Sequence, residues 1–238
     1  MADAPETAVK NRLLAHIPAS ERERIQPLLE EVPLDFHEDL YQQNQPTECV
    51  WFPYSGVVSL VTELSDGEPV EVATIGPEGM VGVQQLLGAD RMSSRAFVQV
   101  PGRAGRMSAA DFRRVVAESP ELNRLLHRYV LALFSFVTQT AACNRMHTIE
   151  ERLARWLLMT NDRVHSREFS LTQEFLAQML GVRRPTVSLA AGMLAKAGLI
   201  HYVRGHITIL DRAGLEGAAC ECYQAIASEF QRLVGTKG

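Results

Sequence analysis

Between residues 170 and 210, hydrophobic positions first recur with the period of a helix and then with that of a strand. In the first segment the apolar side chains would form one buried stripe made of Leu171, Phe175, Leu176, Met179 and Leu180. Thr172 is placed to cap this helix, with Glu174 in its first turn, and Ser170 with Gln173 offers an alternative capping box. Gly181 follows where the helix must end, because glycine tolerates the left-handed conformation of a C-terminal cap.

A second helix is predicted after this turn, starting near Arg183. Pro185 fits its first turn, where the missing N–H would have no helical partner. The inward face would be formed by Val187, Ala191 and Leu194. Two strand-like runs then flank the turn Arg204-Gly205-His206, at 199–203 and 207–210. Two helices, a tight turn and a hairpin are typical of a winged helix-turn-helix, which places its second helix in the DNA major groove.

The first half of the chain instead shows many short apolar runs separated by turn residues. Strands are predicted over 50–52, 57–62, 70–75, 97–100 and 104–107. Turn signals stand at Pro53, Ser55-Gly56, Asp66-Gly67, Gly76-Pro77 and Pro101-Gly102. Residues 11–31 favour short helical segments. A series of short strands after such segments predicts a small β-barrel or jelly roll.

A long helical pattern joins the two halves, from Pro120 to about Asn161. Its apolar stripe consists of Leu122, Leu125, Tyr129, Leu133, Phe136 and Thr140, with Leu126, Val130 and Val137 alongside. Because this face is broad, the helix is expected to pack on the barrel and on a twin helix of a second chain at once. A core helix of a monomer is the alternative.

Composition agrees with a folded, two-domain protein of 238 residues, 46% hydrophobic and 22% charged. No apolar run reaches the roughly 18 residues of a membrane span, so no membrane partner is expected. The N-terminal residues lack the apolar core of a signal peptide. Four cysteines without regular spacing favour a reducing compartment, and a cytoplasmic location is expected.

Charge is distributed unevenly along the chain. The net charge is −4, but residues 151–212 carry +4 and the remainder carries −8. A basic module on an acidic body suits DNA contact at one end of the molecule. Without the helix-turn-helix pattern, a chance fluctuation of surface charge would explain the same numbers.

Two stretches resemble the Crp/Fnr family of bacterial transcription regulators. LAQMLGVRRPTVSLAAGMLAKAGLI, at 176–200, is similar to its DNA-binding end, and WFPYSGVVSLVTELSDGEPVEVATIGPEGMVG, at 51–82, is similar to a sensor barrel of one subgroup. The resemblance implies an α+β fold: a cyclic-nucleotide-binding-like β-barrel at 1–118, a dimerisation helix at 119–150 and a winged helix-turn-helix at 151–238. It also implies double-stranded DNA, a second copy of the chain and RNA polymerase as partners.

The resemblance further assigns roles in DNA binding. Arg184 aligns with a base-reading arginine and can contact guanine with two hydrogen bonds, and Ser188 can contact a base edge. Contacts to phosphates, which set the register on DNA, are assigned to Thr172, Gln173, Arg183, Thr186 and Arg204. Pro185 and Leu189 replace a glutamate and an arginine of well-known members. Leu189 is therefore expected to meet a thymine methyl group, and the operator to differ from the usual site.

The nucleotide pocket of the family needs a Gly-Glu pair for the ribose and an Arg-Ser pair for the phosphate. Val83 stands where the glutamate would be, and Arg95 lies one place from the usual arginine. Glu78 and Arg95 could form a pocket in a shifted register. The favoured alternative is a tight glycine-rich connection over 76–82 with Arg95 on the surface. Cyclic AMP is therefore not expected as the effector, and no cofactor is predicted.

The cysteines form no recognisable metal motif. Cys143 and His147 are one helical turn apart and could share a ligand, although a free cysteine on a helix is more often packed in the core. Cys220 and Cys222 are separated by one residue instead of two, and Cys49 stands alone. The N-terminal cysteine cluster of the family's iron–sulfur sensors is missing. No metal site is expected.

Other classes of function remain open. One alternative is a ligand-responsive protein that acts on a protein partner, which would need an intact nucleotide pocket. Another is a constitutive regulator without any effector, which would not need this pocket. An enzyme is not expected, because the sequence has no P-loop, no G-x-S-x-G and no H-E-x-x-H motif.

Overall fold

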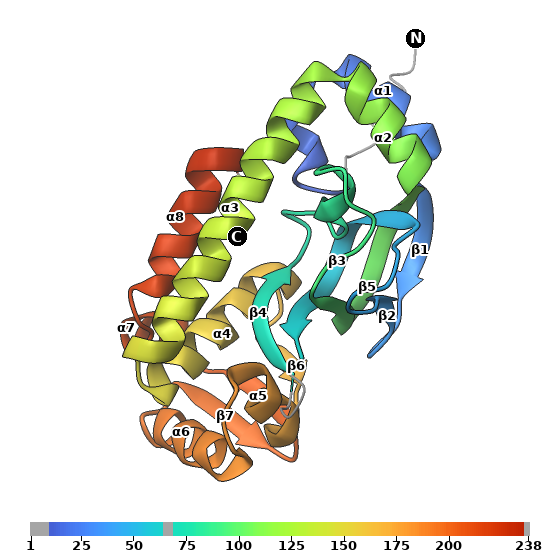
Figure 1. The fold of residues 1–238 in the computed structure, drawn as a ribbon. Coiled ribbons are helices and arrows are strands. Elements are labelled where there is room, and N and C mark those ends of the chain that lie inside the picture. The colour runs from blue at the N-terminus through green and yellow to red at the C-terminus, as the bar shows by residue number, and fades with distance from the viewer. Residues whose placement is uncertain (1–9, 64–68, 236–238) are drawn as a thin grey trace.

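The structure, a computed structural model, describes residues 10–63 and 69–235. It has a β-rich N-terminal part, a long central helix and a helical C-terminal part with a small sheet (Figure 1). The predicted α+β fold class is confirmed. Among the described residues, no helix combines the length and the apolar character needed to cross a membrane.

The N-terminal part is an antiparallel sheet preceded by short helices. The helical segments predicted over 11–31 are η1 (Leu14–His16), α1 (Ala19–Ile25) and η2 (Gln26–Leu28). The strands are β1 (Glu30–Leu34), β2 (Asp39–Tyr41), β3 (Cys49–Thr62), β4 (Val70–Ile75) and β5 (Arg95–Ser108). Their order is β1-β5-β3-β4, with β2 also paired to β5, and η3 (Val83–Gln85) lies between β4 and β5.

Three of the predicted turns are bends inside long strands. The runs at 50–52 and 57–62 both belong to β3, and those at 97–100 and 104–107 both belong to β5. The register between these strands shifts next to Pro53, Ser55 and Val57. Gly56 has a φ of +83°, and a Cβ there would lie 2.5 Å from the Val100 carbonyl oxygen. Glycine therefore allows the strands to bend at close approach instead of ending. The turn predicted at Asp66-Gly67 lies outside the described residues.

The prediction of a single helix from Pro120 to about Asn161 is wrong, because the chain forms two helices there. Helix α2 (Ala109–Glu118) precedes α3 (Pro120–Met146), and α4 (Ile149–Val164) follows a break. His147 has an extended backbone, and Thr148 begins a capping box with Glu151. The Thr148 side chain accepts from the Glu151 N–H, and the Glu151 carboxylate accepts from the Thr148 N–H at 2.8 Å. This cap satisfies the first donors of α4, so the chain can change direction at the break.

The C-terminal part confirms the winged helix-turn-helix. Its elements are α5 (Gln173–Leu180), α6 (Arg184–Lys196), β7 (Ile200–Val203) and β8 (His206–Ile209). A strand that was not predicted, β6 (Glu168–Ser170), pairs with β8 and makes the wing three-stranded. Ser170 therefore lies in a strand, where its Oγ contacts His206 Nδ1 at 3.0 Å, and Thr172 caps α5. His206 begins β8, so the turn consists of Arg204 and Gly205, both with positive φ.

Two more helices, α7 (Arg212–Ala218) and α8 (Cys222–Val234), return the chain to its N-terminal part. Helix α8 lies alongside α3 (Figure 1), and Phe230 makes edge-to-face contacts with Tyr129 and Phe136, each with centroids 6.3 Å apart. A Cβ on Gly235 would lie 2.9 Å from Nε2 of His16, so the end of α8 reaches η1. Buried side chains from both parts join in one continuous core.

Candidate DNA-binding interface

The two helices of the helix-turn-helix are held together by local polar contacts. Thr172 Oγ1 accepts from the Phe175 N–H at 3.1 Å and closes the start of α5. Gly181 adopts a φ of +62° at its end. Ser188 Oγ of α6 donates to Gln173 Oε1 of α5 at 2.7 Å. These contacts hold the outward face of α6 in one position relative to the start of α5.

The outward face of α6 carries apolar side chains as well as arginines. Leu189 is 72% exposed and Met193, one turn later, is 50% exposed. The inward residues Val187, Ala191 and Leu194 are buried, as predicted. Because the exposed pair has no cover within the chain, this face can make apolar contacts with a partner.

A groove runs between the start of the two helices and the wing. It is lined by Thr172, Gln173, Arg184, Tyr202, Arg204 and Gly205. The Tyr202 hydroxyl donates to the Leu171 carbonyl at 2.7 Å, and burial raises its pKa to about 12, although the charge of Arg184 acts in the opposite direction. Tyr202 is therefore neutral at physiological pH, and the charge on the groove comes from its arginines.

Three arginines around this groove have uncompensated charges. Arg183, Arg184 and Arg204 are exposed, and no acidic side chain in the described part of the chain forms an ion pair with them. Arg183 is the N-cap of α6, where the helix dipole adds to the positive potential. Such a cluster is suited to bind DNA phosphates.

The structure brings all eight predicted DNA-contact residues to this end of the molecule. Exposed side chains are those of Thr172, Arg183, Arg184, Leu189 and Arg204, and half-buried ones are those of Gln173, Thr186 and Ser188. The sequence analysis missed Met193 and Tyr202. Met193 follows Leu189 by four residues, and this helical spacing could have indicated it.

Glu78 and Arg95, the two residues of the less favoured shifted-register pocket, are held by different partners. Glu78 is buried and accepts from Arg163 Nε at 2.8 Å, from Arg12 at 3.3 Å and from the Gly76 N–H at 3.0 Å. Arg95 donates to Asp39 and Glu63, and its guanidinium lies over the ring of Phe97 at 5.1 Å. None of the described contacts joins Glu78 to Arg95.

A buried carboxyl at the joint between the sheet and α4 also escaped sequence analysis. Glu71 of β4 accepts from Ser59 Oγ at 2.8 Å and from Trp156 Nε1 of α4 at 2.7 Å. Burial raises its pKa to about 7. The sequence did not single out Glu71, because α4, the helix that covers it, lies 85 residues further along the chain.

Residues that could hold a metal lie elsewhere, at the end of α3. The ligand atoms of Cys143, His147, Cys220 and Cys222 all lie within 4.8 Å of one another. The expectation that there is no metal site rested on considering these residues as two separate pairs.

Comparison with known proteins supports this description of both parts. Residues 32–119 match the cyclic nucleotide-binding domain, and residues 151–218 match the Crp-like helix-turn-helix domain. The CRP-like cAMP-activated global transcriptional regulator of Mycobacterium tuberculosis is 25% identical over 188 residues, covering 75% of this chain and 84% of that protein. The nitrogen fixation regulation protein FixK of Bradyrhizobium diazoefficiens is 24% identical over 189 residues, covering 76% and 78%. The solved structure of FixK2 from Bradyrhizobium japonicum aligns with a TM-score of 0.69 and 19% identity, covering 81% of this chain and 98% of that one.

A cyclic nucleotide-binding-type domain followed by a winged helix defines a DNA-binding transcription regulator of the Crp/Fnr type. DNA binding through the helix-turn-helix follows from the match of residues 151–218.

Proposed function

We propose that the chain is a homodimeric, sequence-specific transcription regulator that inserts α6 into the major groove. The observation that carries this proposal is the cluster formed by Arg183, Arg184 and Arg204 around the groove between α6 and the wing. Uncompensated guanidinium groups beside a helix start would meet the phosphates on both sides of a major groove.

Side chains of the cluster would take different roles. Arg184 would form two hydrogen bonds with a guanine, and Leu189 would contact a thymine methyl group. Ser188 would offer its hydroxyl oxygen to a base edge. Phosphate contacts would come from Thr172, Gln173, Arg183, Thr186 and Arg204. Because Gln173 Oε1 accepts from Ser188, its amide nitrogen is the group that would donate to a phosphate.

A second stripe on α3 supports the dimer. Leu131 and Phe134 are 48% and 64% exposed, whereas the stripe predicted from sequence is buried against the chain's own core. Exposed residues continue at alternating steps of four and three: His127, Leu131, Phe134, Thr138, Ala141 and Arg145. This spacing is that of a coiled-coil seam, so α3 of two chains would pair along it and set the winged helices about one turn of DNA apart.

The sensor domain would respond to something other than cyclic AMP, or to nothing. Val83 is a buried apolar residue where the family's ribose-binding glutamate is expected, and Glu78 is already engaged by Arg163. We retain 1–118 as the sensor, 119–150 as the dimerisation segment and 151–238 as the DNA-binding unit. A cytoplasmic location and contact with RNA polymerase belong to the same proposal.

Selection of fragments from sheared genomic DNA by the purified full-length protein, without added ligand, tests the proposal. Recovery of a two-fold symmetric site is expected. If a folded protein enriches no sequence, the proposal of a ligand-free, sequence-specific regulator is wrong.

A further inference from the structure

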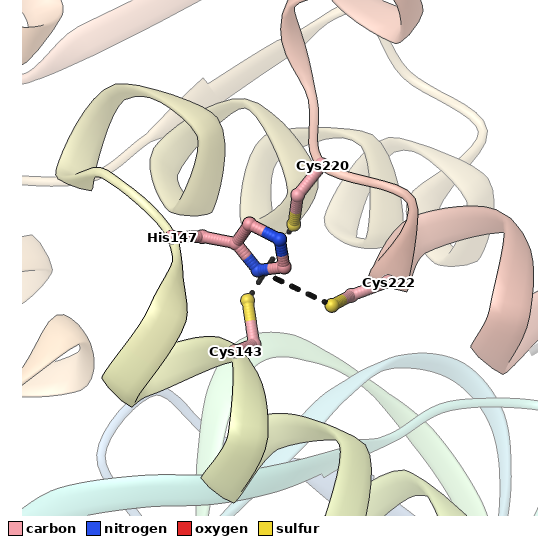
Figure 2. Close-up of side chains that lie close together, drawn as sticks. All are labelled: Cys143, His147, Cys220 and Cys222. Atoms are coloured by element: carbon pink, nitrogen blue, oxygen red, sulfur yellow. Dashed lines mark hydrogen bonds between the residues drawn. The ribbon is translucent and has the colours of Figure 1, made fainter.

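Three cysteines and a histidine converge where the last turn of α3 meets the segment between α7 and α8. Cys143 and His147 come from α3 and its C-terminal cap, and Cys220 and Cys222 come from the segment that leads into α8. Figure 2 shows the four side chains pointing toward one point from these two separate segments. The three thiols are buried and belong to one cluster.

Spacing of the ligand atoms fits a single tetrahedral metal ion. Metal–sulfur bonds of about 2.3 Å and metal–nitrogen bonds of about 2.0 Å place neighbouring ligands of a tetrahedron roughly 3.5–3.8 Å apart. Cys143 Sγ lies 3.5 Å from Cys220 Sγ, and Cys222 Sγ lies 3.5 Å from His147 Nδ1. All four ligand atoms lie within 4.8 Å of one another. A cluster of several metal atoms, each bound by a different protein ligand, would need wider spacing between the ligand atoms than this.

The imidazole is oriented as a metal ligand would be. Its Nδ1 faces the thiols, while its Nε2 lies 3.1 Å from the Glu221 carboxylate. A carboxylate on the second ring nitrogen fixes the tautomer that leaves the first nitrogen free to bind a metal. Gln139 Nε2 donates to Cys222 Sγ at 3.1 Å, a contact that stabilises negative charge on that sulfur.

Nearby arginines provide the charge that such a centre requires. Arg152 and Arg155 of α4 are 7% and 4% exposed, and neither forms an ion pair with any carboxylate in the described residues. A divalent ion with three thiolates carries a net charge of −1, which one of these two guanidinium groups is enough to neutralise.

We propose that Cys143, His147, Cys220 and Cys222 bind one zinc ion as a closed structural site. Three thiolates and one imidazole form a ligand set that selects zinc, and four protein ligands leave no position open for a substrate. The ion would join the end of α3 to the start of α8. It would thereby hold the C-terminal segment of the DNA-binding unit on the helix that carries the exposed stripe.

Metal content of the full-length protein, expressed with zinc and purified without chelator under reducing conditions, tests the site. About one zinc per chain is expected. Cys220→Ser and Cys222→Ser should each lose most of the zinc, whereas Cys222→His, which keeps a metal ligand, should retain it. Cys49→Ser is the matched control, because Cys49 lies at the start of β3 and is not one of the four grouped residues.

A second test uses the native protein, so its result does not depend on whether the variants fold. Titration of the native protein with an organomercurial should release zinc in step with the loss of three thiols. The cobalt-substituted protein should show the absorption of a tetrahedral thiolate complex. Removal of zinc with a chelator should lower the melting temperature of the native protein.

Three results would overturn the proposal. The first is a reduced, folded protein that contains no zinc and takes none up. The second is a Cys49→Ser protein that loses as much zinc as Cys220→Ser. The third is a disulfide between Cys143 and Cys220 in the protein isolated without oxidant, because a disulfide sulfur is not a thiolate ligand.

Discussion

Arg163 of α4 and Glu78 of the loop after β4 form a buried ion pair, with Nε 2.8 Å from Oε1 and both side chains no more than 1% exposed. Arg163 also donates to the carbonyl oxygens of Met159 and Thr74. The guanidinium of Arg163 is thus satisfied by groups from both domains. This pair is a polar link between the sensor sheet and the helix that leads to the DNA-binding unit.

Removing one partner of this pair should destabilise the protein strongly. Arg163→Met leaves the Glu78 carboxylate buried with only Arg12 and the Gly76 N–H as partners, and such losses amount to roughly 3–5 kcal/mol. The free energy of unfolding, measured by urea denaturation, gives the effect. The double variant Glu78→Leu/Arg163→Met should recover part of it, because no buried charge remains. A loss below about 1 kcal/mol for Arg163→Met would contradict the buried pair.

Substitutions at the two adjacent arginines should have different effects on DNA binding. Arg184→Ala should reduce discrimination at one base pair of each half-site by about 1–3 kcal/mol. Arg183→Ala should weaken binding to all sequences alike. It should also reduce the slope of log K against log salt concentration by about one unit for each chain that contacts the DNA. Fluorescence anisotropy with specific and random duplexes at several salt concentrations separates the two. If both variants lose affinity equally on both duplexes, the assigned roles are wrong.

A charge on the exposed stripe of α3 should prevent dimerisation without unfolding the chain. Phe134 is 64% exposed, so Phe134→Glu costs little in the monomer but would bury two like charges in the paired helices. Sedimentation should show a monomer, and affinity for a two-fold symmetric site should fall at least tenfold. Gln45→Glu, at an exposed position between β2 and β3, adds the same charge outside α3 and is the control. A Phe134→Glu protein that remains a dimer would place the interface elsewhere.

Glu71 should make stability depend on pH. An unfolded glutamate has a pKa near 4.3, whereas burial raises the pKa of Glu71 in the folded protein to about 7. The folded state therefore favours the protonated carboxyl, and its contribution is full below about pH 4 and is lost as the pH rises through 7. Glu71→Gln keeps acceptor and donor groups for Trp156 and Ser59 without ionising. At pH 8 it should be more stable than the parent by about 3–4 kcal/mol.

Urea unfolding at pH 5 and pH 8 measures this difference. The advantage of Glu71→Gln should be small at pH 5 and clear at pH 8. Glu174→Gln serves as the control, since Glu174 is exposed at the start of α5. An advantage of Glu71→Gln that does not change with pH would show that the carboxyl does not titrate in this range.

Local signals predicted the winged helix well, because its caps, turn glycine and hairpin are encoded by neighbouring residues. Thr172, Gly181 and Arg204-Gly205 each act within four residues of their own position. The capping box at Thr148 and Glu151 was also visible in the sequence. It was overlooked because apolar residues continue at helical spacing on both sides of the break.

Strand length and side-chain clusters were harder to predict, because they depend on distant segments. Bends at Gly56 and Gly102 look like turns in sequence, and only the crossing of β3 and β5 shows that the strands continue. Glu71 is buried by a helix 85 residues away. The metal ligands are 75 and 77 residues apart, so neither pair alone indicated a site.

The return of α8 along α3 adds a further attachment between the DNA-binding unit and the rest of the protein. Phe230 packs on Tyr129 and Phe136, and Gly235 ends beside His16. At the other end of the unit, Phe175 of α5 lies against Phe97 of β5, with ring centroids 6.3 Å apart. A displacement of the winged helix relative to the sheet would therefore have to break packing at both ends of the unit. The face that carries the three arginines is braced by the rest of the chain instead of being carried on a flexible linker.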